Sequence, residues 1–330
     1  MKIAILTITE DARKLALNLV QNLDKDPTII TIKMFHKNIK EALIDSFYEY
    51  DCILGIMATG IMIRNICPLI KNKLEDPAVL VMDDRGKHII SLLSGHLGGA
   101  NDLAMKIAEI SGSEPVITTA TDIHGKIGID SISRRYYLDI KNSKDIVTIN
   151  SAIIKNKKVD LYVPERFDFI FKDNDIERTY RQKKSIDNNL VAVYNKKSII
   201  LKPKKLVLGI GSRKGIEKNK VYNAINNAIK ILNLPIDRID SIATGIMKKN
   251  ELGIVQIAKE LKLPLETFTI QQIKCFNNDD CSPSKFVENK FGISGVCEPA
   301  ALIAAGTGSR LIFKKTAYNG VTIALAVSNE

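Results

Sequence analysis

A glycine-rich segment with one histidine is the part of the sequence best equipped for chemistry. It reads Ser91-Leu-Leu-Ser-Gly-His-Leu-Gly-Gly-Ala-Asn-Asp102. Gly95, Gly98 and Gly99 allow a ligand to approach the backbone closely, and the N-terminus of a following helix favours an anion. A histidine such as His96 can act as a general acid or base near neutral pH. The segment is therefore either the centre of a reactive site or a glycine turn with a helix-capping histidine.

Further polar side chains follow the predicted strands of the same region. In an open parallel sheet the carboxyl ends of the strands line one crevice, where ligands bind. We therefore expect several of these side chains to converge with His96 at one edge of the sheet, although unrelated loop positions are the alternative. The expected group contains Thr59, Arg64, Asp83, Asn101 and Asp122.

A second glycine-rich stretch, Gly209-Ile-Gly-Ser-Arg-Lys-Gly215, follows a predicted strand and precedes a predicted helix. Successive backbone N–H groups in such a turn can hold a phosphate or carboxylate, and Arg213 and Lys214 add positive charge. The stretch lacks the spacing of a phosphate-binding P-loop or of a dinucleotide-binding fingerprint. Farther along, Glu298 precedes a predicted helix, where an acidic residue commonly interacts with the helix dipole.

Metal-ligand patterns are absent from the sequence. His88, His96 and His124 have acidic neighbours, but their spacing fits no histidine–glutamate metal signature. The five cysteines are odd in number and contain no C-x-x-C pair, which argues against a disulfide framework and a structural zinc site. We expect no metal bound by the protein itself.

Short apolar runs alternate with amphipathic stretches at both ends of the chain, a pattern typical of parallel sheets covered by helices. We expect two open, mostly parallel α/β domains with a small α+β middle domain. The predicted domains are 1–126, which carries the main site loops, 127–204, which is small and basic, and 205–330. The predicted strands include 3–8, 29–32, 52–57, 78–82, 87–92, 116–118, 206–210, 239–242, 265–268 and 321–327, and helices are expected over 12–23, 60–70, 97–110, 221–232, 251–261 and 299–305.

Composition restricts the class of protein and of partner. The apolar start of the chain is followed by Glu10 and Asp11 rather than a cleavage site, and no stretch approaches the roughly 20 apolar residues of a membrane span. We therefore expect a cytoplasmic protein. The formal charge of +11 is concentrated in residues 141–205 and favours an anionic partner, namely nucleic acid, phosphate or a polycarboxylate. The absence of Trp and of a basic stripe with stacking aromatics makes nucleic acid the weakest of these partners.

These motifs, in this order, resemble the cobalt-precorrin-5A hydrolases of anaerobic cobalamin synthesis. The resemblance covers most of the chain, whereas the middle region matches only in length and position. The matching strings are Thr59-Gly60, Arg64, Cys67-Pro-Leu69, Asp76-Pro-Ala-Val79, Asp83-Asp84, Leu92-Leu-Ser-Gly-His-Leu-Gly-Gly-Ala-Asn101, Val116-Ile-Thr-Thr-Ala-Thr-Asp122, Leu208-Gly-Ile-Gly-Ser-Arg-Lys-Gly215, Lys248-Lys-Asn-Glu-Leu252, Glu298-Pro-Ala-Ala-Leu302 and Thr322-Ile-Ala-Leu-Ala326.

The resemblance implies the reaction. The substrate of this family is a cobalt-bearing macrocycle with a fused lactone and several carboxylate arms. The enzyme adds water to open the lactone and releases a two-carbon fragment as acetaldehyde, yielding cobalt-precorrin-5B. The cobalt arrives within the substrate, so no separate cofactor is expected. A homodimer and transient contacts with neighbouring enzymes of the pathway are further expectations.

The resemblance also leads to a hypothesis about residue roles. His96 is the expected general base toward the water that opens the lactone, and N–H groups near Gly98 and Gly99 would stabilise the oxyanion. Asp83 or Asp122 would orient His96 or assist loss of the fragment. Arg64 would bind a carboxylate arm through its planar fork. The remaining expected substrate contacts are Thr59, Gly60, Ser94, Asn101, Thr119, Arg213, Lys214 and Glu298.

Two other functions are compatible with the sequence. A non-catalytic corrinoid carrier would bind the macrocycle and leave it unchanged. A regulator that binds a nucleotide or phosphate would use the stretch Gly209–Gly215, and a nucleotide would then raise its thermal stability.

Overall fold

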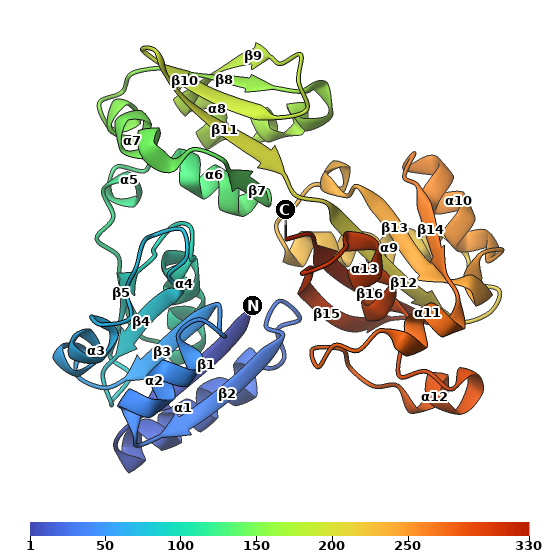
Figure 1. Cartoon of the computed structure of the whole chain (residues 1–330), viewed down its shortest axis with the longest axis horizontal. Helices are drawn as coiled ribbons and strands as arrows, with labels where there is room; N and C mark the ends of the chain where they lie inside the picture. Colours follow the sequence, from blue (N-terminus) through green and yellow to red (C-terminus); the bar gives the residue numbers. More distant parts are fainter. Residues whose placement is uncertain (330) are drawn as a thin grey trace. The chain divides into compact units, whose positions relative to one another are not determined.

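The structure is a computed structural model, and it describes residues 1–329. It contains three sheets in two compact units, Met1–Lys202 and the residues from Pro203 onward (Figure 1). The first unit holds the sheets β1–β6 and β7–β11, and the second holds β12–β16. The expected fold class, α/β with more than one domain, is confirmed. The division into three domains stays a prediction; the described residues form two compact units, the first of which holds two sheets.

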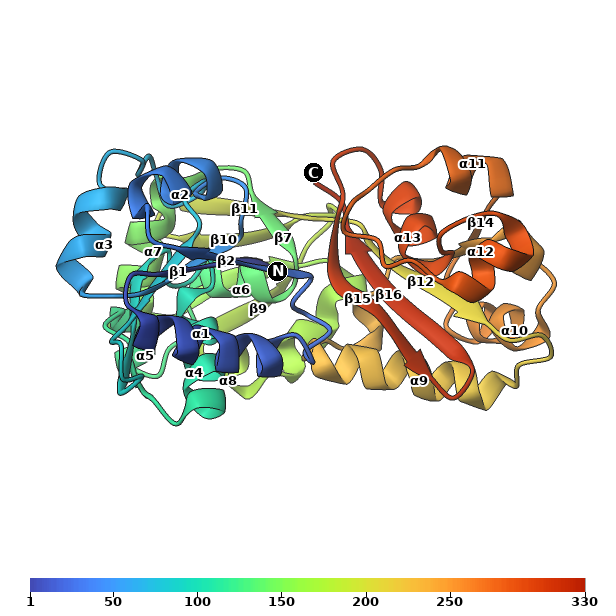
Figure 2. The ribbon, with the colours of Figure 1, turned by 90° about the horizontal axis from the view of Figure 1, so that it is seen from below.

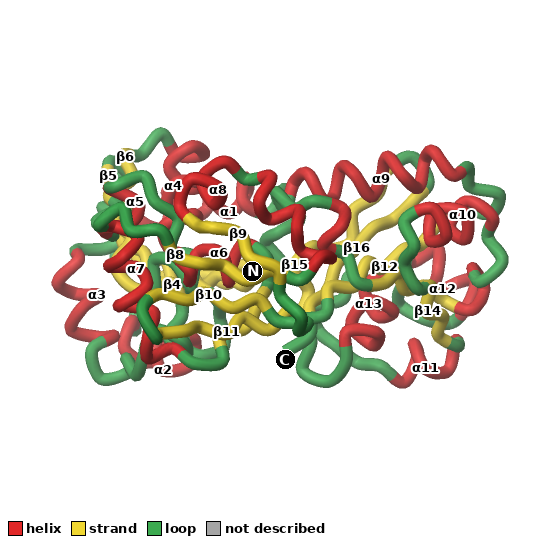
Figure 3. The backbone as a smooth tube through the Cα atoms, turned by 90° about the horizontal axis from the view of Figure 1, so that it is seen from above, coloured by secondary structure: helices red, strands yellow, loops and turns green. Residues whose placement is uncertain are grey.

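The first sheet has the strand order β2-β1-β3-β4-β5-β6 and is covered on both faces. Alternate residues of β1 enter different cores, Ile3 and Ile5 on one face and Ala4 and Leu6 on the other. Helices α1 and α4 cover the first of these faces and α2 and α3 the second (Figures 2 and 3). The elements are β1 Lys2–Thr7, α1 Glu10–Leu23, β2 Thr31–His36, α2 Ile39–Ser46, β3 Cys52–Ile56, α3 Thr59–Ile66, β4 Ala78–Met82, β5 His88–Leu93, α4 Ala100–Ser111, β6 Glu114–Val116 and α5 Ala120–Ile123.

A tight turn after β4 reverses the direction of the chain. The strands from β2 to β4 are parallel, but β5 is antiparallel to β4 and β6 is parallel to β5. The carboxylate of Asp83 fixes this turn, because it accepts hydrogen bonds from the N–H groups of Arg85, Lys87 and His88. The carboxyl ends of β5 and β6 therefore lie at the opposite edge of the sheet from those of β1, β3 and β4.

Helix α4 begins three residues later than the sequence predicted. Gly99 has a φ of +84°, a left-handed conformation, so it ends the loop and leaves the helix to start at Ala100. Ser94 is also left-handed, at φ +55°, and its carbonyl accepts from the N–H of Ala100. Residues 94–99 consequently form a compact loop, which we call the His96 loop.

The second sheet has the order β7-β11-β10-β8-β9, with β10 antiparallel to both β8 and β11 and with β9 parallel to β8. Buried Ile149 and Ile153 of α7 belong to its apolar core. The elements are α6 Ile129–Arg135, β7 Leu138–Ile140, η1 Ser143–Asp145, α7 Ile146–Ile154, β8 Val159–Val163, η2 Glu165–Lys172, α8 Asn174–Thr179, β9 Tyr180–Lys184, β10 Leu190–Tyr194 and β11 Lys197–Pro203.

The second unit is a mixed sheet of order β14-β13-β12-β16-β15, with α13 on one face and α9 on the other (Figure 2). Strands β12, β13 and β14 are parallel, and β16 is antiparallel both to β12 and to its hairpin partner β15. Strand β15 is absent from the sequence prediction. The elements are β12 Leu206–Ser212, α9 Lys218–Ile231, η3 Ile236–Arg238, β13 Ser241–Gly245, η4 Ile246–Lys248, α10 Leu252–Glu260, β14 Leu265–Phe268, α11 Ile270–Cys275, α12 Lys285–Phe291, α13 Cys297–Ala305, β15 Arg310–Tyr318 and β16 Val321–Val327.

The interpretation of Gly209–Gly215 as a glycine-rich turn is wrong for its first four residues. Gly209 and Gly211 lie inside the central strand β12. A Cβ at Gly209 would stand 2.0 Å from the carbonyl oxygen of Cys297, so this glycine permits the close packing of α13 on the sheet. Only the end of the stretch, at Gly215, is a turn with positive φ.

Candidate functional site

His96 lies at the centre of a hydrogen-bonded group formed by the His96 loop, α5 and α6. Its Nε2 is 2.7 Å from the Thr121 hydroxyl and 3.4 Å from the Asp122 carboxylate, and its Nδ1 is 3.1 Å from the Ser131 hydroxyl. The His96 side chain is 16% exposed. Both ring nitrogens therefore have partners on the protein, and of the two carboxylates proposed from the sequence, Asp83 and Asp122, it is Asp122 that lies beside one of them.

Asn101 holds Asp122 in place. Its amide donates to the Thr119 hydroxyl at 2.8 Å and to Asp122 Oδ2 at 3.2 Å, and its carbonyl oxygen accepts from Ser91 at 2.6 Å. The Thr119 hydroxyl also donates to Asp122. Asn101 is buried, so its geometry supports a positioning role for this side chain more than direct contact with a ligand. Ser94 is similarly occupied, since its hydroxyl donates to the carbonyl of Asp76.

Arg134 of α6 fastens the His96 loop from the outside. Its guanidinium donates to the carbonyls of Leu97 and Gly98 at 3.2 and 2.8 Å and pairs with Asp102 at 3.4 Å. A Cβ at Gly99 would meet the same guanidinium at 1.8 Å, so glycine is required for this contact. Because a trans peptide points its C=O and N–H in opposite directions, the N–H groups of Gly98 and Gly99 face away from Arg134.

The expected convergence of all polar strand ends at one edge is wrong. Thr59, Gly60, Arg64 and Asp83 lie at the edge formed by the carboxyl ends of β3 and β4, because those two strands are parallel. The His96 loop follows β5, which runs antiparallel to β4, and therefore lies at the other edge. The five residues of β4 separate the two edges by about 13 Å at the usual rise per residue.

The chemistry of Asp83 also differs from expectation. Burial by itself would raise the pKa of this carboxyl, but the hydrogen bonds from the N–H groups of His88, Lys87 and Arg85 hold the pKa below its ordinary value. His88 Nδ1 is a further neighbour at 3.6 Å. A carboxylate stabilised in this way is a poor proton acceptor, so its geometry fits a turn-forming role.

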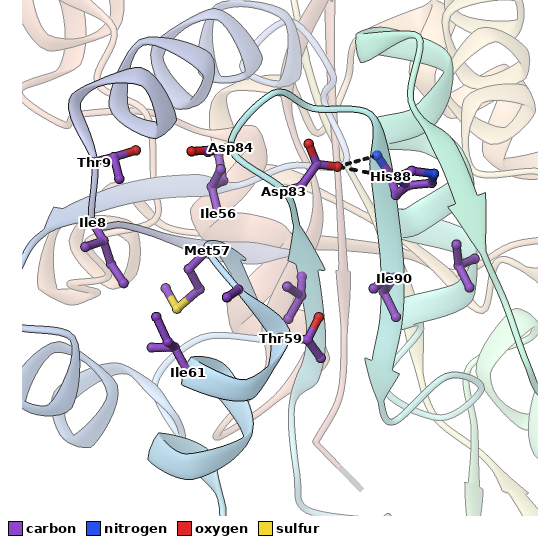
Figure 4. Close-up of a pocket in the computed structure, with 13 residues that line it drawn as sticks. Ile8, Thr9, Ile56, Met57, Thr59, Ile61, Asp83, Asp84, His88 and Ile90 are labelled. Atoms are coloured by element: carbon purple, nitrogen blue, oxygen red, sulfur yellow. Dashed lines mark hydrogen bonds and ion pairs between the residues drawn. The ribbon is translucent and has the colours of Figure 1, made fainter.

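A cavity of about 580 Å³ opens at the Thr59 edge (Figure 4). Most of its lining is apolar, including Met57, Ile61 and Ile90, and its charged groups are Asp83 and Asp84 with His88 nearby. Two carboxylates would repel a polycarboxylate ligand. The cavity and the His96 group are thus two separate locations with different chemistry.

In the second unit, the turn at Gly215 holds a carboxylate of the protein itself. Oε1 of Glu251 accepts from the N–H groups of Gly215 and Ile216 at 2.7 and 3.0 Å, and Oε2 accepts from Lys248 at 3.1 Å. Burial alone would raise the pKa of Glu251, but Lys248 and these two N–H groups lower it. The N–H groups at the end of the predicted stretch therefore bind an anion, but that anion is the protein's own Glu251 carboxylate. Arg213 and Lys214 beside it are exposed.

Glu298 is a buried structural acid rather than an open contact. Glu298 lies in the first turn of α13 and is only 1% exposed. It accepts from the N–H and hydroxyl of Ser282 at 2.8 and 3.2 Å and from the N–H of Lys315 at 2.8 Å. Lys315 Nζ in turn donates to the carbonyls of Ser282 and Pro283. Glu298 thereby joins the 282–283 segment to β15.

Within residues 1–329 all five cysteines are free thiols, and no group of three His, Cys, Asp or Glu side chains is arranged to hold a metal ion. Burial raises the pKa of Cys297 and of Cys281 to about 12, which leaves both thiols protonated at neutral pH. In the same range, no helix combines the length and the apolar character needed to cross a membrane.

Sequence reasoning missed three partners of the His96 loop. Thr121 lies inside the quoted motif Val116–Asp122 but was not singled out. Ser131 and Arg134 come from the middle domain, where only length and position matched the family. The pairing of a histidine with hydroxyls 25 and 35 residues away depends on packing between segments, and no local pattern in one sequence reports it.

Known proteins show where this chain belongs. The family profile described as "Cobalamin synthesis G N-terminal" matches residues 41–122, and the profile "Cobalamin synthesis G C-terminus" matches residues 206–326. A Methanocaldococcus jannaschii protein named "Probable cobalt-precorrin-5A hydrolase" is 35% identical, with both chains covered completely. The Salmonella typhimurium "Cobalt-precorrin-5A hydrolase" is 32% identical over 86% of this chain and 84% of its own length.

A solved structure agrees with the sequence relatives. The crystal structure of a cobalamin biosynthesis protein G homologue from Sulfolobus solfataricus superposes with a TM-score of 0.62 at 28% identity. The match covers 99% of this chain and 97% of the other. The likeness extends over both compact units, including the middle sheet that the two family profiles leave unmatched. The chain belongs to the cobalt-precorrin-5A hydrolase family.

Proposed function

We propose that this protein hydrolyses cobalt-precorrin-5A, opening the lactone and releasing acetaldehyde. Family membership supports the substrate, and one observation supports the location of the chemistry. This observation is the imidazole of His96, held between the Asp122 carboxylate and a hydroxyl in a half-buried setting. An enzyme that hydrolyses a lactone needs a positioned proton acceptor, and the imidazole of His96 is the proposed one.

His96 is the proposed general base, and Asp122 is its proposed partner. A carboxylate 3.4 Å from Nε2 favours a proton on that nitrogen, which leaves Nδ1 free to accept another. When Nδ1 accepts that proton, the ring becomes cationic and Asp122 stabilises it. Asn101 and Thr119 keep the carboxylate in position through their hydrogen bonds to Oδ2.

Negative charge that develops on the carbonyl oxygen of the lactone would be stabilised at the His96 loop. The His96 loop leads into α4, whose N-terminus favours negative charge. The N–H groups of Gly98 and Gly99 remain the proposed donors. The cavity at the Thr59 edge receives no catalytic step in this proposal, because its carboxylates disfavour a polycarboxylate substrate and Asp83 is engaged in its turn. Cobalt enters as part of the substrate, and no additional cofactor is proposed.

Anaerobic incubation with cobalt-precorrin-5A, followed by mass analysis, tests the proposed function. The expected result is an opened product together with acetaldehyde, with no nucleotide or metal added. Tight binding without turnover would instead indicate a corrinoid carrier. Stabilisation by a nucleotide in a thermal melt, without turnover, would indicate a regulator; the occupation of the Gly215 turn by Glu251 argues against that outcome.

A further inference from the structure

Two hydroxyls, those of Ser131 and Thr121, are partners of His96 to which the proposed reaction assigns no step. Ser131 is the one beside Nδ1. Its Oγ lies 3.1 Å from Nδ1, on the opposite side of the ring from Asp122. With the proton on Nε2, beside the Asp122 carboxylate and donated to the Thr121 hydroxyl, Nδ1 presents a lone pair to Ser131. Ser131 is then hydrogen-bonded to an imidazole that has a carboxylate, Asp122, 3.4 Å from its other nitrogen. A hydroxyl, an imidazole and a carboxylate in this order are the groups that activate a serine for attack on an acyl carbon.

Thr121 is the competing hydroxyl, because it lies 2.7 Å from Nε2. It is only 4% exposed, whereas Ser131 is partly exposed. In addition, Asp122 stands beside the same nitrogen and favours its protonation, so Nε2 donates to Thr121 rather than removing its proton. Ser131 is therefore the hydroxyl that is both accessible and adjacent to a proton-accepting nitrogen.

The backbone around Ser131 is firmly positioned. Asn150 of α7 accepts from the N–H of Ile129 at 3.0 Å and donates to Asp130 at 3.0 Å, which fixes the start of α6. One turn after Ser131, Arg134 binds the carbonyls of the His96 loop. Contacts on both sides of Ser131 thus hold its hydroxyl against the imidazole. Such preorganisation is what a catalytic nucleophile requires.

We propose that Ser131 is the nucleophile that opens the lactone, through a covalent acyl-enzyme. This inference rests on the proposed function. The Ser131 oxygen forms a bond to the lactone carbonyl carbon while the ring C–O bond breaks. The proton of Ser131 passes to His96 Nδ1 and then to the departing alkoxide, giving an alcohol on the macrocycle and an ester on Ser131.

Water completes the reaction at the same centre. Its oxygen bonds to the acyl carbon, the Ser131 C–O bond breaks, and the water proton travels through His96 to the Ser131 oxygen. The sum is one lactone and one water giving one carboxylic acid and one alcohol, with no oxidant or reductant. Loss of acetaldehyde proceeds from the alcohol and is not assigned to Ser131.

A thiol introduced by Ser131→Cys tests the geometry without any substrate. If His96 faces this position, the new thiol ionises well below the ordinary thiol pKa of about 8.5 and reacts rapidly with iodoacetamide at pH 6–7, as thiols beside histidine do. Peptide mass analysis separates it from the exposed Cys67 and Cys275. The second change His96→Asn should return the reaction to an ordinary pH profile. An ordinary profile with His96 present would contradict the inference.

Turnover with cobalt-precorrin-5A tests the chemical role. Ser131→Ala should lower lactone opening by about 10³-fold or more, the scale seen when a nucleophile of this kind is removed. Ser133→Ala is the matched control on the same helix, since its hydroxyl donates to the Leu138 carbonyl; turnover per folded molecule should stay normal. If Ser131→Ala lowers lactone opening less than about tenfold while His96→Asn abolishes it, His96 activates water directly and the nucleophile proposal is wrong. If the unmodified protein has no turnover, the proposed function fails, and the thiol experiment still decides the geometry.

Discussion

Two glycine-rich segments of this protein look alike in sequence but adopt different structures and have different binding partners. The His96 loop is bound by side chains from other segments, with Arg134 at its carbonyls and Ser131 at its histidine. The Gly209–Gly215 stretch is mostly strand, and its one turn binds Glu251 from the same unit. Glycine thus permits a close approach in both segments. In the His96 loop the approaching group is the cationic side chain of Arg134, and at β12 it is helix α13.

The largest difference in turnover is expected between alanine variants of two glycines that have similar backbone strain. Gly99 and Gly215 have φ values of +84° and +74°, so alanine at either should lower the unfolding free energy by about 1–2 kcal/mol. A Cβ at Gly99 also meets Arg134, whereas Gly215 has nothing within 4 Å. Gly99→Ala should therefore displace the loop and lower turnover by about 10²-fold, a typical cost of misplacing a catalytic group.

Gly215→Ala is the control, and its turnover should remain normal. Steady-state kinetics and thermal melts of the two variants separate strain from misplacement. Equal turnover in both variants would mean that the contact between Arg134 and the loop does not position the catalytic group.

A smaller loss of activity is expected from removing the Arg134 side chain that binds the His96 loop. Arg134→Gln loses the hydrogen bonds to Leu97 and Gly98, and its unfolding free energy should fall by about 1–3 kcal/mol. Turnover should fall about tenfold, because the loop keeps its own backbone bonds. Arg135→Gln is matched, since the neighbouring Arg135 pairs with Asp173 within the middle domain. A similar loss of turnover in both variants would point to general destabilisation of α6.

Glu251→Gln should affect stability and leave turnover unchanged. The pKa of Glu251 is lowered in the folded protein, so the carboxylate stabilises the fold above its unfolded-state pKa, and this contribution is lost as pH falls through the lowered folded-state pKa. Above pH 5 the variant should be less stable by about 1–3 kcal/mol. Between that pH and acidic pH its stability should fall less steeply than that of the unmodified protein. Denaturant melts across this range measure both effects, and parallel curves would contradict the assignment.

The smallest effect is expected from the exposed charges beside this turn. Arg213→Ala combined with Lys214→Ala removes two positive charges that are open to solvent. If they bind carboxylate arms, substrate binding should weaken about three- to tenfold at low salt, and the difference should shrink as salt screens it. The chemical step at saturation should be unchanged. A loss of binding independent of salt would exclude a charge contact.

The sequence identified the pieces of this protein better than their arrangement. Apolar runs located β4, β14 and β16 at their observed bounds, and the combination of histidine with glycines located the His96 loop. The convergence of Asp83 with His96 failed because one antiparallel strand, β5, moves the loop to the other edge of the sheet. Ser131 was missed because its contact with His96 arises from the packing of α6, which local periodicity does not encode.

The central claim is that the reaction occurs at the His96 loop and not at the Gly215 turn. Single-turnover measurement of lactone opening and acetaldehyde release, with His96→Asn and Glu251→Gln compared at saturating cobalt-precorrin-5A, tests it most directly. We predict that His96→Asn slows lactone opening by about 10²-fold or more while binding changes little, and that Glu251→Gln reacts at the normal rate. Normal turnover in His96→Asn would contradict the account.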